Sequence, residues 1–141
     1  MFTTFIINLS LVTLSVIIHY EVLYQLAKQL PSVAIPPRYR VLLGVFVIII
    51  THIVEIWLFA IGYYLMIKID GLGTLTGNID QTLLDCTYYS FTNYTTLGFG
   101  DIEPSGHIRF LTGLESLTGL VLITWSASFL FLEMQKYWPK R

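Results

Sequence analysis

Three long apolar stretches constrain this chain more than any other feature, because each one is longer than a lipid bilayer is thick. They run from about residues 5 to 25, 41 to 67 and 108 to 132. At about 1.5 Å per helical residue, each exceeds the ~30 Å hydrocarbon core of a bilayer. Composition agrees, since 55% of the residues are hydrophobic and 12% are charged, about half the charged share of a typical soluble domain. These features predict an all-α membrane protein with three transmembrane helices, and they exclude a soluble or a disordered protein.

A shorter amphipathic stretch, from 81 to 94, lies between the second and third apolar stretches. With about 14 residues it is too short to cross the bilayer. A glycine- and threonine-rich loop at 70–78 precedes it, and glycine-containing backbone follows it. A short helix that ends in glycine-rich backbone is typical of a re-entrant loop.

The basic residues predict which side of the membrane each loop occupies. With three spans, six of them fall on one side: Lys28, Arg38, Arg40, Lys136, Lys140 and Arg141. Only Lys68 and Arg109 fall on the other. By the positive-inside rule we expect a multi-pass protein of the cell membrane, with the C-terminus cytoplasmic and the N-terminus outside. Two alternatives remain for the first stretch: a cleaved signal peptide, although no basic residue precedes the apolar run, and an interfacial helix, since this stretch is the most polar of the three.

Residues 95–101, Thr-Thr-Leu-Gly-Phe-Gly-Asp, resemble the selectivity-filter signature of potassium channels. The commonest version has Val where this chain has Leu97 and Tyr where it has Phe99. The motif follows a short helix between two spans, which is its position in that family. The resemblance covers about residues 41–132 and is to small prokaryotic two-helix channels, with one extra N-terminal span here.

The resemblance implies a tetrameric potassium-channel pore architecture, in which three transmembrane helices accompany a re-entrant pore helix and selectivity filter. The implied parts are an extra N-terminal helix at 1–28, a cytoplasmic connector at 29–40, a pore module at 41–135 and a short cytoplasmic tail at 136–141. Within the pore module we expect an outer helix at 41–67, a pore loop at 68–106 and an inner helix at 107–133.

The resemblance also implies how ions would pass. Backbone carbonyls of Thr96, Leu97, Gly98 and Phe99, with the Thr96 hydroxyl below, would replace the hydration shell of K⁺. Stacked carbonyls need alternating backbone conformations, some at positive φ, which glycine adopts without penalty at Gly98 and Gly100. Leu97 and Phe99 would point away from the pore and pack against their surroundings. One chain supplies a quarter of each carbonyl ring, so the partner is a further three copies in a homotetramer.

Several residues are candidates for supporting the filter. They are Tyr88, Tyr89, Thr92, Thr95, Asp101 and Glu115. Residues 88–91 fall where the family carries an aromatic cuff. Thr92 stands where some members place a glutamate that pairs with the aspartate after the filter, which leaves Tyr88 as the candidate partner of Asp101. Glu115 should pass behind the pore helix, near Thr92 and Asn93, and buttress the filter by hydrogen bonding; the alternative is that it reaches the cavity or a neighbouring subunit. Phe99 lacks the hydroxyl with which the family's tyrosine often bonds the cuff, so we expect a less firmly braced filter.

Two glycines of the third apolar stretch are candidate gating hinges. Gly119 falls near the inner-helix glycine that many members use as a hinge, and Gly113 is a weaker candidate.

His52 and Glu55 lie three residues apart, on one face of the second span. Ionisable groups within a membrane are functional candidates, so one interpretation is a pH or metal sensor. The other is a polar contact with the first span, through Ser10, Thr13 or Ser15. His19 is expected to pack against another helix. A metal site built from Cys and His is not expected, because the chain has one cysteine and three histidines.

The sequence therefore predicts a potassium-selective channel, with K⁺ as the permeant ion and the lipid bilayer as its surroundings. We expect no cofactor, no nucleic acid and no soluble partner. An enzyme is not expected, because no nucleophile–base set is apparent. The alternatives are a weakly selective monovalent cation channel, if Leu97 and Phe99 loosen the filter, or a non-conducting membrane sensor or regulatory subunit.

Overall fold

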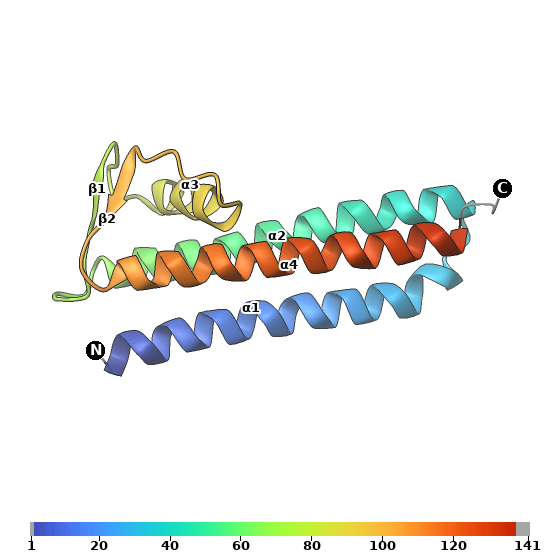
Figure 1. Ribbon diagram of the computed structural model, residues 1–141, viewed down its shortest axis with the longest axis horizontal. Coiled ribbons are helices and arrows are strands. Elements are labelled where there is room, and N and C mark those ends of the chain that lie inside the picture. Colours follow the sequence, from blue (N-terminus) through green and yellow to red (C-terminus); the bar gives the residue numbers. More distant parts are fainter. Residues whose placement is uncertain (1, 138–141) are drawn as a thin grey trace.

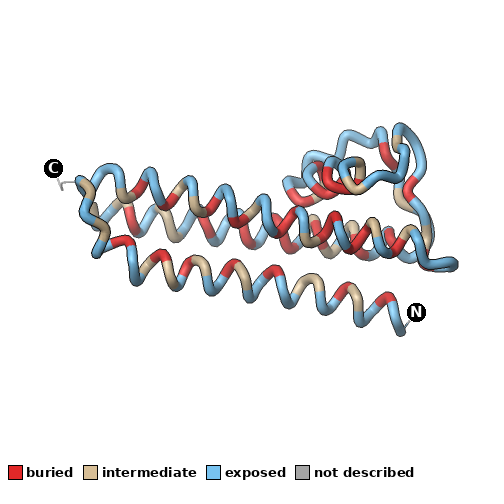
Figure 2. Tube along the Cα trace, turned by 180° about the vertical axis from the view of Figure 1, so that it is seen from behind, coloured by how far each residue is buried: buried red, intermediate tan, exposed pale blue. Residues whose placement is uncertain are grey.

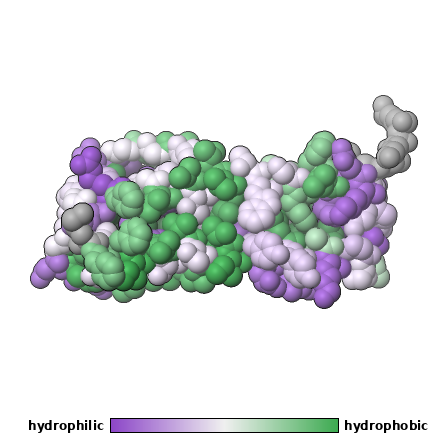
Figure 3. Space-filling model, turned by 60° about the horizontal axis from the view of Figure 1, so that its bottom comes forward, coloured by the Kyte–Doolittle hydropathy of each residue, from purple (hydrophilic) through white to green (hydrophobic). Residues whose placement is uncertain are grey.

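A computed structural model describes residues 2–137 of the chain, in which three long helices lie side by side (Figure 1). They are α1 (Phe2–Gln29), α2 (Pro37–Met66) and α4 (Ile108–Tyr137). All three are long and apolar enough to cross a membrane. Hydrophobic side chains cover a broad area of the face in Figure 3, and hydrophilic ones gather toward its ends. The all-α membrane architecture predicted from the sequence is confirmed.

The smaller elements gather near one end of the long helices. Between α2 and α4 the chain forms strand β1 (Leu75–Gly77), helix α3 (Leu83–Tyr94) and strand β2 (Ile102–Pro104), while a 3-10 turn, η1 (Leu30–Ser32), follows α1. Helix α3 packs on α2 and α4, and α1 packs on the same two helices from the other side (Figure 1). The N-terminal end of α1 lies at the end that carries β1 and β2, and the C-terminal end of α4 lies at the opposite end. This placement fits three crossings.

Two helix boundaries differ from those predicted by more than one residue. Helix α2 begins at Pro37 rather than at residue 41, because proline lacks only an N–H that the first helical turn leaves unpaired. Helix α4 continues to Tyr137 rather than ending at 133, since no proline or glycine interrupts residues 133–137. Of the tail predicted at 136–141, residues 138–141 lie outside the described part of the chain.

A small antiparallel sheet joins the two arms of the segment between α2 and α4, where the sequence predicted only loop. Leu75 pairs with Pro104, and Gly77 pairs with Ile102. Gly77 has φ 109°, and an added Cβ would lie 2.3 Å from the backbone oxygen of Asp101. Glycine is therefore required there both by backbone conformation and by the close approach of the second strand.

The largest buried cluster lies where α2, α3 and α4 meet, and it includes Phe59, Tyr63, Tyr94 and Leu111. Burial in α1 is confined to periodic positions along one side of the helix (Figure 2). Several of these positions are polar: Thr4, Asn8, Ser15 and His19. Among the described residues the side chains of Thr4, Asn8 and Ser15 have no hydrogen-bond partner. The polar attachment of α1 to the other helices is thus concentrated at His19.

Candidate functional site

Helix α3 starts with a capping box that fixes its first turn. The Thr82 hydroxyl accepts a hydrogen bond from the Asp85 N–H at 3.2 Å, and the Thr82 N–H donates to Asp85 Oδ2 at 3.1 Å. Hydrogen bonds from the Thr82 side chain and backbone hold the pKa of Asp85 below its usual value. Two backbone donors at the start of the helix are satisfied in this way. The partially negative C-terminal end of α3 then points toward residues 95–101.

The backbone of residues 95–101, here called the 95–101 loop, alternates in conformation. Thr96, Gly98 and Gly100 have φ of 60°, 53° and 79°, whereas Leu97 and Phe99 do not have positive φ. A Cβ added to Gly98 or Gly100 would meet nothing within 4 Å. Glycine is therefore favoured at both positions by the positive φ, and not by a lack of space for a side chain. Thr96 adopts the same region although it is β-branched, which is uncommon. This alternation is the conformation predicted for carbonyls that line a pore.

The 95–101 loop is tied to α3 but is otherwise exposed. The Gly98 N–H donates to the Thr92 oxygen, and the Thr96 N–H donates to the Asn93 oxygen, both at 2.9 Å. All residues of the loop are exposed in the single chain. The predicted outward packing of Leu97 and Phe99 is met only in part within one chain, where they are 61% and 63% exposed and Phe99 contacts Tyr88. These two side chains are therefore available to a neighbouring subunit.

Tyr88 braces the outer part of the loop. Its ring stacks on Phe99, with 6.4 Å between centroids, and its hydroxyl donates to Asp101 Oδ2 at 2.9 Å. The pKa of Tyr88 is raised, because the Asp101 carboxylate accepts this hydrogen bond. The Tyr88–Asp101 contact predicted from the sequence is confirmed.

Glu115 is fully buried and joins three helices. It accepts hydrogen bonds from the hydroxyls of Ser90 in α3 and Tyr63 in α2. The sequence predicts Glu115 beside Thr92 and Asn93, whereas its contact on α3 is Ser90, which lies nearer the start of that helix. The number of residues between Asp101 and Glu115 does not determine the height at which α4 crosses α3, which is why the prediction differs from the structure.

The remaining candidate support residues make more local contacts. Tyr89 lies 2.9 Å from the Thr112 hydroxyl of α4. The hydroxyls of Thr92, in α3, and of Thr95, which follows it, donate to the backbone oxygens of Tyr89 and Phe91 in α3. The role of all these residues in supporting a filter stays a prediction.

The two candidate hinge glycines have different surroundings. A Cβ added to Gly119 would lie 2.1 Å from the backbone oxygen of Tyr94, whereas one added to Gly113 would meet nothing within 4 Å. Gly119 therefore has a packing reason to be glycine, at the crossing of α4 and α3. The hinge role of either residue stays a prediction.

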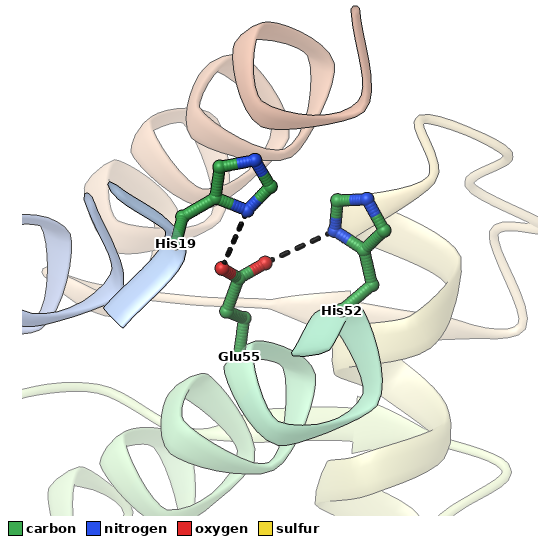
Figure 4. A group of neighbouring side chains, drawn as sticks. All are labelled: His19, His52 and Glu55. Atoms are coloured by element: carbon green, nitrogen blue, oxygen red, sulfur yellow. Dashed lines mark hydrogen bonds and ion pairs between the residues drawn. The ribbon is translucent and has the colours of Figure 1, made fainter. Parts of the chain in front are cut away.

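His52 and Glu55 do lie together, and a residue of α1 joins them. Glu55 Oε2 lies 3.0 Å from His52 Nδ1, and Oε1 lies 2.9 Å from His19 Nδ1 (Figure 4). The Tyr94 hydroxyl, from the last residue of α3, also donates to Glu55.

The contact with the first span thus exists, but through a different residue from those predicted. Ser10 and Thr13 are exposed, and the buried Ser15 hydroxyl has no partner in the part of the chain that the structure describes. His19 lies four residues after Ser15, on the buried side of the helix. The prediction that His19 packs against another helix is confirmed, whereas its pairing with Glu55 was not predicted. The sensing role of His52 and Glu55 stays a prediction.

A family model described as an ion channel matches residues 42–136, which is more than half of the chain. The chain belongs to this ion channel family. The matched segment of the channel begins in α2, includes α3 and the 95–101 loop, and ends in α4. Helix α1 lies outside it. A search of curated proteins and a search of solved structures each found no match.

Proposed function

We propose that four copies of this channel surround a potassium-selective pore formed by their 95–101 loops. The observation that carries the proposal is the alternation of backbone conformation, with positive φ at Thr96, Gly98 and Gly100. In such a backbone the carbonyls of residues 96–99 can face one axis and replace the water around K⁺. The C-terminal end of α3 adds a partial negative charge that favours a cation at the inner end of the loop.

The exposed surface of the loop supports the assembly of several chains. Leu97 and Phe99 are each more than 60% exposed, on a segment that lies outside the three membrane-spanning helices. A ring of identical chains closes most simply by rotation about one axis, and four chains complete each ring of carbonyls. In this assembly the N-terminus and the 95–101 loop face the outside of the cell membrane, and the end of α4 faces the cytoplasm.

The test is the current through purified protein in a planar bilayer, with potassium on one side and sodium on the other. Reversal near the potassium equilibrium potential, together with block by barium, is the expected result. Reversal near zero would contradict potassium selectivity and favour a weakly selective cation pore. Protein that inserts as a ring of chains and stays silent over voltage and pH would contradict conduction.

Two glycine variants make the test specific to the 95–101 loop. Gly98 and Gly71 both have positive φ, 53° and 84°, and in both cases an added Cβ meets nothing within 4 Å. The strain that alanine introduces is therefore comparable, at about 1–2 kcal/mol. Gly98→Ala should abolish selectivity or current, whereas Gly71→Ala, in the loop after α2, should leave both unchanged. Equal effects would show that strain alone, and not the pore, is responsible.

A further inference from the structure

His19, His52 and Glu55, here called the His–Glu cluster, lie where α1 meets the family-matched part of the chain. Their side chains can offer three ligand atoms that lie within 4.8 Å of one another. Both imidazole rings turn toward the carboxylate (Figure 4). The side chains of His19 and Glu55 are fully buried, and that of His52 is 16% exposed. The cluster is therefore enclosed, with one open edge at His52.

The ring nitrogens that point away from Glu55, Nε2 of His19 and Nε2 of His52, both lie within hydrogen-bond distance of one hydroxyl of α4. Ser126 Oγ lies 3.2 Å from Nε2 of His19 and 3.2 Å from Nε2 of His52. A serine hydroxyl has one proton to donate and two lone pairs that accept. If both neutral imidazoles carried their proton on Nδ1, both Nε2 atoms would need a donor, and Ser126 could satisfy one of them.

In the opposite arrangement, Ser126 Oγ can serve both rings as an acceptor. When both imidazoles carry the proton on Nε2, both donate to Ser126 Oγ, which accepts the two bonds. Both Nδ1 lone pairs then face the Glu55 carboxylate, which is the arrangement in which a metal ion can bind between them. A histidine that ligates a metal commonly donates its other ring N–H to a partner in this way, which fixes the tautomer and the ring orientation. The metal-free alternative is a mixed pair of tautomers, in which His19 Nδ1–H donates to Glu55 and His52 Nδ1 accepts from the Tyr94 hydroxyl.

The donor set fits a metal ion of the zinc class. Two imidazole nitrogens and one carboxylate oxygen are a ligand set that Zn²⁺ accepts, with a fourth position left to a further oxygen. Bonds of about 2.0–2.2 Å in a tetrahedral site place ligand atoms about 3.3 Å apart. The two nitrogen–oxygen distances in the cluster are 2.9 Å to Oε1 and 3.0 Å to Oε2 of Glu55, and one ligand atom from each residue lies within 4.8 Å of the others. Binding therefore requires the side chains to draw together by up to about 1.5 Å. The Tyr94 hydroxyl also lies close to the cluster, 3.0 Å from His52 Nδ1.

We propose that His19, His52 and Glu55 bind one divalent metal ion of the zinc class per chain, and that Ser126 and Tyr94 position the ligands. The ion links α1 to α2 directly. Through Tyr94, the last residue of α3, it also fixes the start of the 95–101 loop. Helix α1, which the family match leaves out, thereby acquires a role as the carrier of one ligand.

The test is metal binding to the full-length protein, purified in detergent and stripped of metal. Titration with Co²⁺ should give the visible absorption bands of a tetrahedral site, saturating at one ion per chain, and Zn²⁺ should displace the cobalt. Calorimetric titration gives the zinc affinity. Because neither readout depends on ion conduction, failure of the proposed pore function would not alter them.

Matched variants separate the cluster from other histidines. His19→Ala and His52→Ala should weaken zinc binding more than 100-fold, while His107→Ala, which removes an exposed histidine outside the cluster, should not change it. Ser126→Ala should weaken it by about 10–100-fold, as the loss of an orienting partner does, and shift the cobalt bands. If an alanine variant fails to fold, Glu55→Gln retains the side-chain volume and should likewise abolish the tetrahedral cobalt spectrum.

Three outcomes would overturn the proposal. They are the absence of saturable zinc binding, binding that persists unchanged in His19→Ala, and binding that His107→Ala weakens as much as His19→Ala does. The first is expected if hydrogen bonds among the two imidazoles, Glu55, Tyr94 and Ser126 complete the cluster without a metal.

Discussion

At the scale of single residues, Gly119 marks the point where α4 passes closest to the end of α3. An added Cβ would lie 2.1 Å from the Tyr94 backbone oxygen, and backbone cannot move aside as a flexible side chain can. We expect Gly119→Ala to lower the free energy of unfolding by about 1–3 kcal/mol, the usual cost of overpacking. Thermal unfolding in detergent measures this.

Gly113→Ala is the matched control for that substitution, because its Cβ meets nothing within 4 Å. Alanine favours a helix over glycine by about 1 kcal/mol, so this variant should be neutral or slightly stabilised. Equal destabilisation of both variants would contradict the packing role of Gly119. A hinge role is a separate property of either glycine, and it would show as a change in gating.

The Tyr63 hydroxyl is a second test at this scale, since it donates to the buried Glu115 carboxyl group. Tyr63→Phe leaves that acceptor with one partner fewer, and we expect a loss of about 1–3 kcal/mol in the free energy of unfolding. Tyr64→Phe is the control, because the neighbouring ring keeps its contact with the Lys68 ammonium, 3.8 Å away, when the hydroxyl is removed. If both variants unfold at the wild-type temperature, Glu115 does not join α2 to α4 as described.

At the scale of elements, the start of α3 should depend on pH through Asp85. The lowered pKa of this carboxyl group means that its ionised form stabilises the capping box. The contribution is therefore complete above its ordinary pKa of about 3.9, and it is lost as the pH falls below that value through the lowered pKa. We expect the thermal midpoint of the wild type to fall more steeply below about pH 4 than that of Asp85→Asn.

Asp80→Asn controls for the general effect of removing an acid near α3. The Asp80 side chain is exposed, and its backbone N–H, which the substitution retains, is the group that bonds Asp85. This variant should keep the wild-type pH dependence. A wild-type profile that matches Asp85→Asn throughout would remove the capping box as the cause.

The elements also show which parts of the fold a sequence can predict. The long helices and α3 were predictable, because continuous apolar length and a short amphipathic run are properties of neighbouring residues. Strands β1 and β2 have three residues each and are held by backbone pairing, which leaves little trace in the sequence. The partnership of His19 with Glu55 spans 36 positions and depends on how two helices rotate about each other. Spacing within one helix could mark His19 as buried, but it could not name its partner.

At the scale of the whole molecule, exposed apolar side chains lie in two places: on the outer sides of the long helices and on the 95–101 loop. The outer sides of the long helices face lipid in a membrane, and α1 lies on the side of α2 and α4 opposite to α3 (Figure 1). The apolar side chains of the 95–101 loop belong to neither the spans nor the core. In the proposed four-fold assembly around the loops, we expect α1 at the periphery, and Leu97 and Phe99 against neighbouring subunits.

This arrangement predicts which substitutions weaken the assembly. Leu97 and Phe99 are 61% and 63% exposed in the single chain, and burying such a side chain contributes about 1.5–3 kcal/mol. Native mass spectrometry should show four chains for the wild type and a smaller tetramer fraction for Leu97→Ser and Phe99→Ser. Ile17→Ser, at a residue of α1 that is 56% exposed, removes a comparable apolar side chain far from the loops and should leave the tetramer intact. A monomeric wild type would contradict the assembly, and equal losses in all three variants would show that general apolar surface, rather than the loop, holds the chains together.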